Sequence, residues 1–305
     1  MSEFQSTQLL YRPDVRKRKG ITYYVKDSLS AVYNPEKNEY FGRTPVRWGF
    51  CALFYLVFWI CIGCLFAICM AVHLYLIVDA NFPERTGLGT LLKQPGLGIR
   101  PTPDLRNPLI RFVQGYPSTY KKYIDQMQGF LEQYDNPQQI GENLMDCTNG
   151  RSILQFDKVC RFNIDWFGDD CTWKEDYGYD EGNPCILLKL NALYGWIPFP
   201  YMPGQIPEQI KEGYRNDSIT VTCEGEGPLD KENIGRLTYH PPWGFQNAFF
   251  PNMNQEGFRA PVVMVRFEQP VNGIVIKVWC KAWASNIYHH RDDQMGSVRF
   301  EILID

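Results

Sequence analysis

The longest apolar segment of the chain runs from Trp48 to Val78, between Arg47 and Asp79, and contains no charged side chain. A helix needs about 20 apolar residues to cross a bilayer, so this segment is long enough to span one. It begins too far from the N-terminus for a typical signal peptide, and no small-residue cleavage pattern follows it. We therefore predict one membrane-spanning helix over residues 48–78.

A second periodic segment, "PSTYKKYIDQMQGFLEQYDNP", begins at Pro117. Its apolar residues recur at steps of three and one and are Tyr120, Tyr123, Ile124, Met127, Phe130, Leu131 and Tyr134. This spacing predicts a helix with a single apolar face that packs on a sheet. We expect Ser118 or Thr119 to cap the helix and Asn136-Pro137 to end it.

Two-residue alternation of apolar and polar positions is typical of half-buried strands, and it recurs in the C-terminal part of the chain. The apolar positions are Ile219, Val221 and Cys223 in "SITVTC"; Ile274, Ile276, Val278 and Cys280 in "GIVIKVWCKAW"; and Val298, Phe300, Ile302 and Ile304 in "SVRFEILI". Asn272-Gly273 separates "VVMVRFEQ" from "GIVIKVWCKAW", which predicts a hairpin with a primed turn.

Together these elements predict a single transmembrane α-helix followed by an antiparallel, immunoglobulin-like β-sandwich with one packed α-helix. The predicted segments are an N-terminal tail over residues 1–47, the membrane helix over 48–78, a stalk over 79–116 and the sandwich over 117–305. Dense prolines and glycines in "NFPERTGLGTLLKQPGLGIRPTPDLRNP" predict an extended, irregular stalk.

The charges on either side of the apolar segment predict its orientation. Residues 1–47 carry nine Lys and Arg, including "RKRK" at 16–19, against five Asp and Glu. Positive residues stay on the cytoplasmic side, so the tail is predicted inside and the sandwich outside the cell. The basic tract is then a solvated face near anionic lipid, and the chain is a type II single-pass protein.

Cysteine usage supports the same topology. Four of the ten cysteines, Cys51, Cys61, Cys64 and Cys69, lie in the apolar segment, and none lies in residues 1–47. The other six are Cys147, Cys160, Cys171, Cys185, Cys223 and Cys280. An even number restricted to the extracellular side predicts three disulfides in an oxidising compartment. A zinc site is the rival interpretation, but the chain has no CxxC pair. Six cysteines allow fifteen pairings, and their spacing does not choose among them.

The extracellular part has one glycosylation sequon, Asn216-Asp217-Ser218, just before a predicted strand and therefore expected at the surface. We find no phosphate-binding GxxxxGKS/T, no GxSxG and no HExxH motif. A type II glycosyltransferase shares the tail, anchor and stem, but the chain lacks the Asp-x-Asp pair that most such enzymes use for Mn²⁺ and sugar nucleotide. An adhesion or sugar-binding receptor is a further alternative, since Trp243, Phe245, Phe249 and Phe250 suit partner contacts.

Several long motifs resemble one known family. They are "EYFGRTPVRW" before the apolar segment, "FYLVFW" within it, and "CRFNIDWFGDDC", "YGYDEGNPCILLKLN", "VVMVRFEQP" and "VWCKAWASNI" beyond it. In their order and in the order of the six cysteines, the chain resembles the β subunits of the Na,K-ATPase and H,K-ATPase from end to end. The longer tail and the single sequon differ from familiar vertebrate members and indicate a divergent or invertebrate form.

This resemblance implies a non-catalytic subunit without a cofactor or nucleic-acid partner. A β subunit of this family assembles with the multi-span catalytic α subunit of a P-type ATPase, helps it to fold, to reach the plasma membrane and to remain stable, and modulates its K⁺ affinity. The implied disulfides are Cys147–Cys160, Cys171–Cys185 and Cys223–Cys280. The implied partners are the α subunit, membrane lipid and, in some tissues, a small FXYD-like subunit.

The resemblance also implies two surfaces for contact with α. Tyr55 and Trp59 are four residues apart and therefore lie on one helical face, deep in the apolar segment where a phenol needs a partner. The matching aromatic pair of the family packs on a membrane helix of α, and the same face continues to Gly63 and Phe66. Outside the membrane, "YHPPWGF" corresponds to a tyrosine-rich family segment that contacts α. Its candidate residues are Tyr239, Pro241, Trp243, Gly244 and Phe245.

Overall fold

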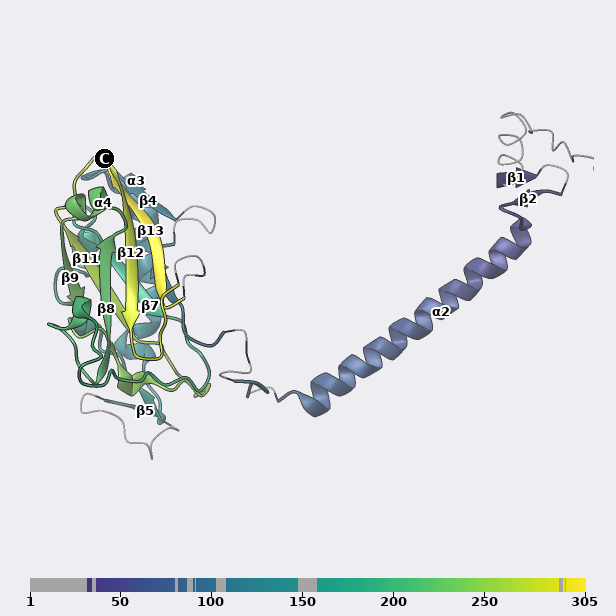
Figure 1. The fold of residues 1–305 in the computed structure, drawn as a ribbon, viewed down its shortest axis with the longest axis horizontal. Coiled ribbons are helices and arrows are strands. Elements are labelled where there is room, and N and C mark those ends of the chain that lie inside the picture. Colours follow the sequence, from purple (N-terminus) through teal and green to yellow (C-terminus); the bar gives the residue numbers. More distant parts are fainter. Residues whose placement is uncertain are drawn as a thin grey trace, which may run out of the picture. The chain divides into compact units, whose positions relative to one another are not determined.

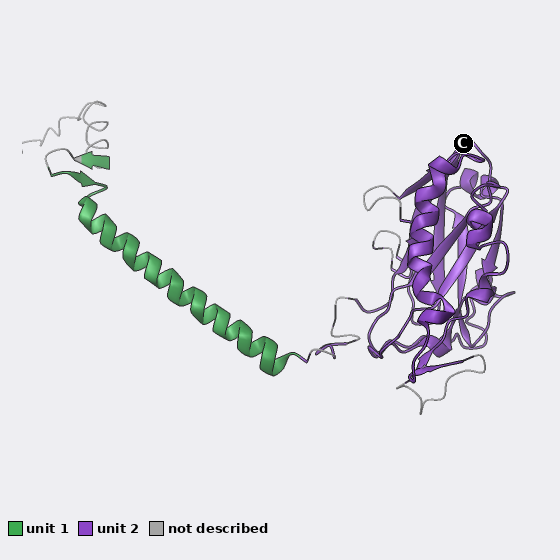
Figure 2. Ribbon diagram, turned by 180° about the vertical axis from the view of Figure 1, so that it is seen from behind, with its two compact units in different colours: residues 1–78 green, residues 79–305 purple. Residues whose placement is uncertain are grey.

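The structure is a computed structural model that describes residues 32–34, 37–79, 82–86, 90, 92–102, 108–147, 158–290, 293 and 295–305 of the chain. The basic tract at 16–19 lies outside the described residues. The chain divides into two compact units, residues 1–78 and 79–305, which are coloured separately in Figure 2. Each unit is described by itself.

The first unit is built around helix α2 (Pro45–Val72), which continues as a π-helix (His73–Ile77). Over Pro45–Ile77 this is the one stretch of the described residues that is long and apolar enough to cross a membrane, and its mean hydropathy is 2.6. None of its residues is buried, as expected for a helix whose surroundings are lipid or other helices. The helix begins before the predicted Trp48 because Pro45 suits the first helical position and Thr44 is extended.

A small ribbon precedes the helix. Strand β1 (Tyr33–Asn34) pairs with strand β2 (Glu39–Tyr40). The indole Nε1 of Trp48 donates a hydrogen bond to the Tyr40 carbonyl at 2.8 Å. The ribbon is thereby tied to the first turn of α2.

The second unit is a sandwich of two sheets (Figure 1). The five-stranded sheet has the order β10 (Phe245–Gln246), β8 (Ser218–Gly225), β12 (Val275–Trp283), β13 (Ser297–Ile304) and β4 (Leu109–Phe112). The four-stranded sheet has the order β3 (Leu97–Arg100), β7 (Cys185–Leu190), β11 (Val262–Glu268) and β9 (Arg236–His240). A separate short pair joins β5 (Leu144–Met145) to β6 (Val159–Cys160). One short helix, α4 (Pro228–Asn233), follows β8.

The core lies between the two sheets. The alternating positions predicted in β8, β12 and β13 are buried, with Ile274, just before β12, partly buried against the core. The rings of Phe267 in β11 and Phe300 in β13 meet edge to face with centroids 6.2 Å apart, which joins the sheets. The strand predictions for these segments are confirmed.

Helix α3 (Pro117–Leu131) packs against the edge strands β3 and β4. The predicted apolar face is confirmed, since Tyr120, Tyr123, Met127 and Leu131 are buried. The predicted cap is wrong, because the helix begins at Pro117 with Tyr116 as its cap residue and no capping side chain. The Thr119 hydroxyl bonds the preceding loop instead, accepting a hydrogen bond from the Val113 amide.

The predicted hairpin at Asn272-Gly273 is wrong. Strand β11 pairs with β7 and β9, whereas β12 pairs with β8 and β13, so residues 269–274 cross from one sheet to the other. Distant segments hold this crossing, because the Gly273 amide donates to Ile304 and the Val271 amide donates to Asn233. Gly273 does adopt the left-handed conformation, with φ +79°, that the turn signal implied. The signal therefore identified a turn but not the strands that it joins.

The predicted stalk is also partly wrong. Strands β3 and β4 lie within residues 79–116, and Leu97, Ile99, Ile110 and Phe112 enter the core. Each strand has only four residues beside prolines, which is why the segment resembles an irregular linker. Strand β4 pairs parallel to β13, so the predicted purely antiparallel sandwich carries one parallel edge.

Candidate partner-docking site

The membrane helix presents one of the two candidate surfaces. Tyr55, Trp59 and Phe66 are exposed on α2, and no atom lies within 4 Å of the position that a Cβ of Gly63 would occupy. Among the described residues the Tyr55 hydroxyl has no hydrogen-bond partner. A buried phenol in hydrocarbon gains stability from an acceptor on a neighbouring helix, and a glycine lets two helix backbones approach closely. The face can therefore pack against another membrane helix.

A second aromatic pair, Phe54 and Phe58, lies beside the first on the same helix. The ring of Phe54 meets that of Tyr55 with centroids 5.5 Å apart, and the ring of Phe58 meets that of Trp59 with centroids 5.7 Å apart. The rings of Phe54 and Phe58 stack with centroids 6.3 Å apart, and both side chains are exposed. This pair has the same four-residue spacing as Tyr55 and Trp59 but is rotated by one residue, about 100° around the helix. It offers a matched comparison for the candidate face.

The second candidate segment, Tyr239–Phe245, begins in β9 and ends in β10. The structure brings its residues together but buries several of them. Pro241 and Gly244 are buried, and Phe245 is 0% exposed where β10 pairs with Ile219 of β8. The expectation that the Phe245 side chain contacts a partner is therefore corrected, because this ring belongs to the core. Tyr239 and Trp243 remain partly exposed, so their side chains are the accessible candidates.

Trp243 sits in an aromatic arrangement that its sequence neighbours do not reveal. Its ring meets that of Trp166 edge to face with centroids 5.9 Å apart, and the Arg215 guanidinium lies 5.8 Å from its centroid. Its indole Nε1 is buried and has no acceptor among the described residues. Leaving a buried donor without an acceptor costs free energy. Trp166 and Arg215 were missed in the sequence because they are distant from Trp243 along the chain.

Tyr239 anchors the start of the segment. Its hydroxyl accepts a hydrogen bond of 2.7 Å from the Cys223 amide in β8. Burial raises its pKa to about 12, while the Cys223 hydrogen bond acts in the opposite direction. The phenol therefore stays neutral and ties β9 to the other sheet.

This raised pKa predicts a loss of stability at alkaline pH. Tyr239 ionises near pH 10 in the unfolded chain and near 12 in the fold, so its contribution is present below pH 10 and lost as pH rises to 12. The loss is about 2–3 kcal/mol by pH 12. Urea unfolding between pH 9 and 12 measures it, and a Tyr239→Phe variant should show a shallower decline. An unchanged slope in that variant would contradict this assignment.

Three disulfides hold the second unit. They join Cys147 to Cys160, Cys171 to Cys185 and Cys223 to Cys280, the same pairs that the family resemblance implies. The last one links directly opposite residues of the neighbouring strands β8 and β12. The free cysteines of the described residues all lie in the membrane helix.

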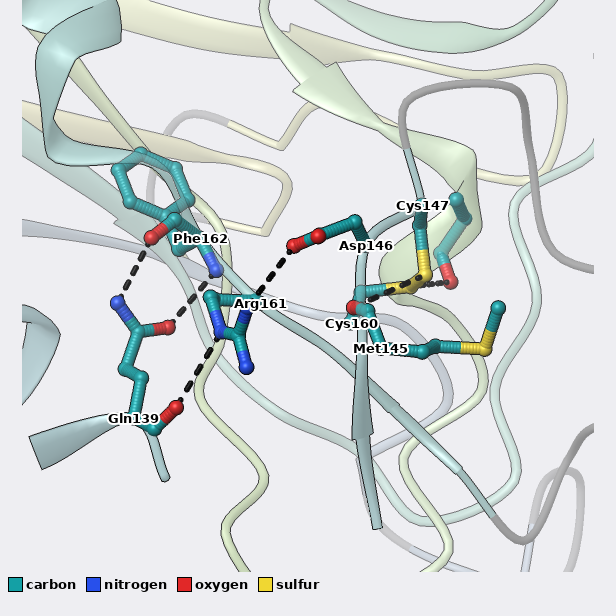
Figure 3. Close-up of a disulfide and its surroundings, with 8 residues drawn as sticks. Gln139, Met145, Asp146, Cys147, Cys160, Arg161 and Phe162 are labelled. Carbon is teal, nitrogen blue, oxygen red and sulfur yellow. Dashed lines mark hydrogen bonds and ion pairs between the residues drawn. A yellow bond between two sulfur atoms is a disulfide. The ribbon is translucent and has the colours of Figure 1, made fainter. Parts of the chain in front are cut away.

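Figure 3 shows how the Cys147–Cys160 region is fixed. The Gln139 side chain is buried; its Nε2 donates to the Phe162 carbonyl at 2.7 Å and its Oε1 accepts from the Phe162 amide at 2.9 Å. Arg161 donates to the Gln139 carbonyl and forms an ion pair with Asp146 at 3.3 Å. The ring of Phe162 in turn meets that of Trp166 edge to face, with centroids 5.1 Å apart. The disulfide region therefore supports the aromatic pair of Trp166 and Trp243.

Four acidic residues lie close together in the sequence "KEDYGYDEG": Glu175, Asp176, Asp180 and Glu181. Two of them have structural partners. The Tyr120 hydroxyl of α3 donates to Asp180 at 2.6 Å, and Glu181 pairs with Arg266 at 3.6 Å. Arg266 also pairs with Asp170 at 2.7 Å. In the part of the chain that the structure describes, no group of three or more His, Cys, Asp or Glu side chains could hold a metal ion.

Among the described residues, one apolar helix long enough to cross a membrane is joined to a two-sheet domain with three disulfides. These features fit a single-pass membrane protein with a disulfide-bonded folded domain. The family described as "Sodium / potassium ATPase beta chain" matches residues 19–300. The chain belongs to this family and is a non-catalytic subunit of an ion-transporting ATPase.

Three relatives illustrate the extent of the match. The Drosophila melanogaster sodium/potassium-transporting ATPase subunit beta-2 is 36% identical, over 98% of this chain and 96% of its own. Subunit beta-1 of the same species is 35% identical, over 90% of this chain and 91% of its own. Subunit beta-2 of Homo sapiens is 27% identical, over 95% of this chain and 98% of its own. The resemblance read from the sequence motifs is confirmed.

Proposed function

We propose that this chain assembles with the catalytic α subunit of a sodium/potassium pump at the plasma membrane, with its N-terminus in the cytoplasm. In that assembly it helps α to fold, leave the endoplasmic reticulum and remain stable, and it modulates K⁺ affinity. The observation that carries the proposal is an exposed aromatic helix face, on which Tyr55, Trp59 and Phe66 are 58%, 66% and 66% exposed. A second membrane helix would supply both packing and an acceptor.

The two candidate surfaces would act at different depths. Tyr55, Trp59, Gly63 and Phe66 would pack within the bilayer, and the segment around Trp243 would contact an extracellular loop of α. In that segment Tyr239, Pro241, Gly244 and Phe245 would set the shape of the backbone beneath the partly exposed indole. We further infer that the sandwich is immunoglobulin-like and that lipid, and in some tissues a small FXYD-like subunit, completes the assembly.

Asn216 is expected to carry an N-linked glycan. It is exposed, and its backbone carbonyl accepts a hydrogen bond of 3.0 Å from the Asn247 side chain. The Asn216→Gln substitution removes the sequon. The untreated variant should therefore migrate on a gel like the wild-type chain that has been treated with glycosidase. Glycosidase should then leave the variant unchanged. A mobility shift that persists in the variant would contradict the assignment.

Purification of the tagged full chain in gentle detergent tests the proposed function. We expect a multi-span P-type ATPase to co-purify and the complex to show K⁺-stimulated, ouabain-sensitive ATP hydrolysis. A correctly disulfide-bonded chain that leaves the endoplasmic reticulum without such a partner would overturn the proposal. A pump-independent adhesion protein would then be the better interpretation.

A further inference from the structure

An exposed apolar loop, residues 195–203, follows β7 in the ectodomain. Ile197, Phe199 and Met202 are 44%, 57% and 68% exposed. Pro198 between the first two is buried, so Ile197 and Phe199 project from the same, outward side of the extended segment. Large apolar side chains that gather on a surface in this way mark an interaction site more often than scattered ones do.

The apolar loop lies in a segment of the chain that carries no charged side chain. No Asp, Glu, Lys or Arg occurs between Lys189 and Glu208, and none occurs between Arg236 and Glu256. These two charge-free segments pack together, since the rings of Trp196 and Phe250 lie 5.5 Å apart. The second segment contains Trp243, so the loop and the extracellular docking segment belong to adjoining charge-free stretches.

The backbone of the apolar loop exposes few hydrogen-bond donors. Pro198, Pro200 and Pro203 have no N–H group. The Phe199 amide donates to the Asn286 side chain at 3.0 Å and the Tyr201 amide donates to the Tyr214 hydroxyl at 2.7 Å.

Some of the loop carbonyls are also paired. The Asn286 side chain donates to the Ile197 carbonyl at 2.8 Å, and the Ser285 amide donates to the Phe199 carbonyl at 2.9 Å. Satisfied backbone groups are what a segment needs in order to enter an apolar environment. A protein-docking surface, by contrast, normally offers about one hydrogen bond per 100–200 Å².

The apolar loop adjoins a residue that follows the membrane segment closely in the sequence. Phe82 follows Val78, the last residue of the charge-free membrane segment, by four residues. An extended chain spans at most about 3.5 Å per residue, so Phe82 can lie no more than about 14 Å along the chain from that end. The Phe82 ring meets that of Tyr194, next to the apolar loop, with centroids 6.1 Å apart.

We propose that the apolar loop is a lipid-contacting element that inserts Ile197, Phe199 and Met202 into the interfacial region of the outer leaflet. Interfacial segments bury apolar side chains about 5–10 Å into the boundary between head groups and acyl chains. Tyr and Trp are enriched at that depth, and Tyr194, Trp196 and Tyr201 border the loop. The contact would give the ectodomain a second attachment to the membrane, independent of assembly with α.

Site-specific photocrosslinking tests this proposal. The photoreactive residue p-benzoylphenylalanine replaces Phe199 or, in a second variant, Met202, in the full chain reconstituted in phosphatidylcholine–phosphatidylserine nanodiscs with and without α. Leu229 provides the matched control. It is 69% exposed and lies on α4, which follows the C-terminal end of β8. Mass spectrometry then identifies what each site has captured.

We expect phospholipid adducts at positions 199 and 202, about tenfold above position 229, whether or not α is present. Capture of α or of a second copy of this chain at 199 and 202, or lipid adducts no more frequent than at 229, would overturn the proposal. Because the lipid contact is measured without α as well, its failure is distinguishable from a failure of pump assembly.

Discussion

Replacing both cysteines of the Cys223–Cys280 disulfide by alanine is expected to lower the free energy of unfolding by about 4 kcal/mol. The bond joins β8 to β12 in the centre of the five-stranded sheet, across a sequence separation of 57 residues. In the chain-entropy account, closing so long a loop restricts the unfolded chain strongly. A loss of this size is a large fraction of the stability of an ordinary domain, so export from the endoplasmic reticulum should fall as well.

The Cys147–Cys160 disulfide is the matched comparison. It closes a separation of only 13 residues, and its removal should cost about 3 kcal/mol, about 1 kcal/mol less than removal of Cys223–Cys280. Urea unfolding of the full chain in detergent, followed by intrinsic fluorescence, measures both variants. An unchanged midpoint for the Cys223–Cys280 variant, or a larger loss for Cys147–Cys160, would contradict the chain-entropy account.

The second large effect is expected for Gly244→Ala, at about 3 kcal/mol. Gly244 has φ +86°, a conformation that L-residues adopt at a cost of about 1–2 kcal/mol. An added Cβ would also lie 2.2 Å from the Ile219 carbonyl oxygen, closer than any real contact. Because that oxygen belongs to β8, relief of the clash would move β10 away from the sheet and displace Trp243.

The Gly204→Ala variant separates the cost of the backbone conformation from the cost of the clash. Gly204 has φ +88°, but no atom lies within 4 Å of the position of an added Cβ. This variant should therefore lose only the conformational part, about 1–2 kcal/mol. Unfolding midpoints of the two variants are compared under the same conditions. Equal losses would show that close packing at Gly244 contributes nothing.

The sequence predicted those parts of the fold that depend on local periodicity. The alternation of Val298, Phe300, Ile302 and Ile304 can bury only one face of a strand, and the three-and-one spacing from Tyr120 to Leu131 can bury only one face of a helix. Such patterns do not specify partners. Asn272-Gly273 marks a turn equally well in a hairpin and in a crossing between sheets. The crossing is held by hydrogen bonds that the Gly273 and Val271 amides donate to the distant carbonyls of Ile304 and Asn233.

The candidate site was predictable to a similar degree. The face of Tyr55 and Trp59 follows from helical geometry alone. Burial of Phe245 does not, because β10 has only two residues and periodicity cannot indicate which side faces the core. The pairing of Trp243 with Trp166 and Arg215 depends on tertiary packing between distant segments, which no local pattern encodes.

The central claim is that one face of the membrane helix binds the α subunit. It is tested most directly by comparing Tyr55→Leu/Trp59→Leu with Phe54→Leu/Phe58→Leu in the tagged full chain. Both double variants replace two exposed aromatic residues of α2 by leucine and keep the helix apolar. The amount of α subunit that co-purifies with each chain is the measured quantity.

Contacts between membrane helices contribute about 1 kcal/mol each, so loss of the Tyr55 and Trp59 contacts, about 2 kcal/mol together, should reduce recovery of α about thirtyfold. The Phe54/Phe58 variant should recover α at the wild-type level. Equal recovery of α by the two double variants would contradict the assignment of this face as the docking surface.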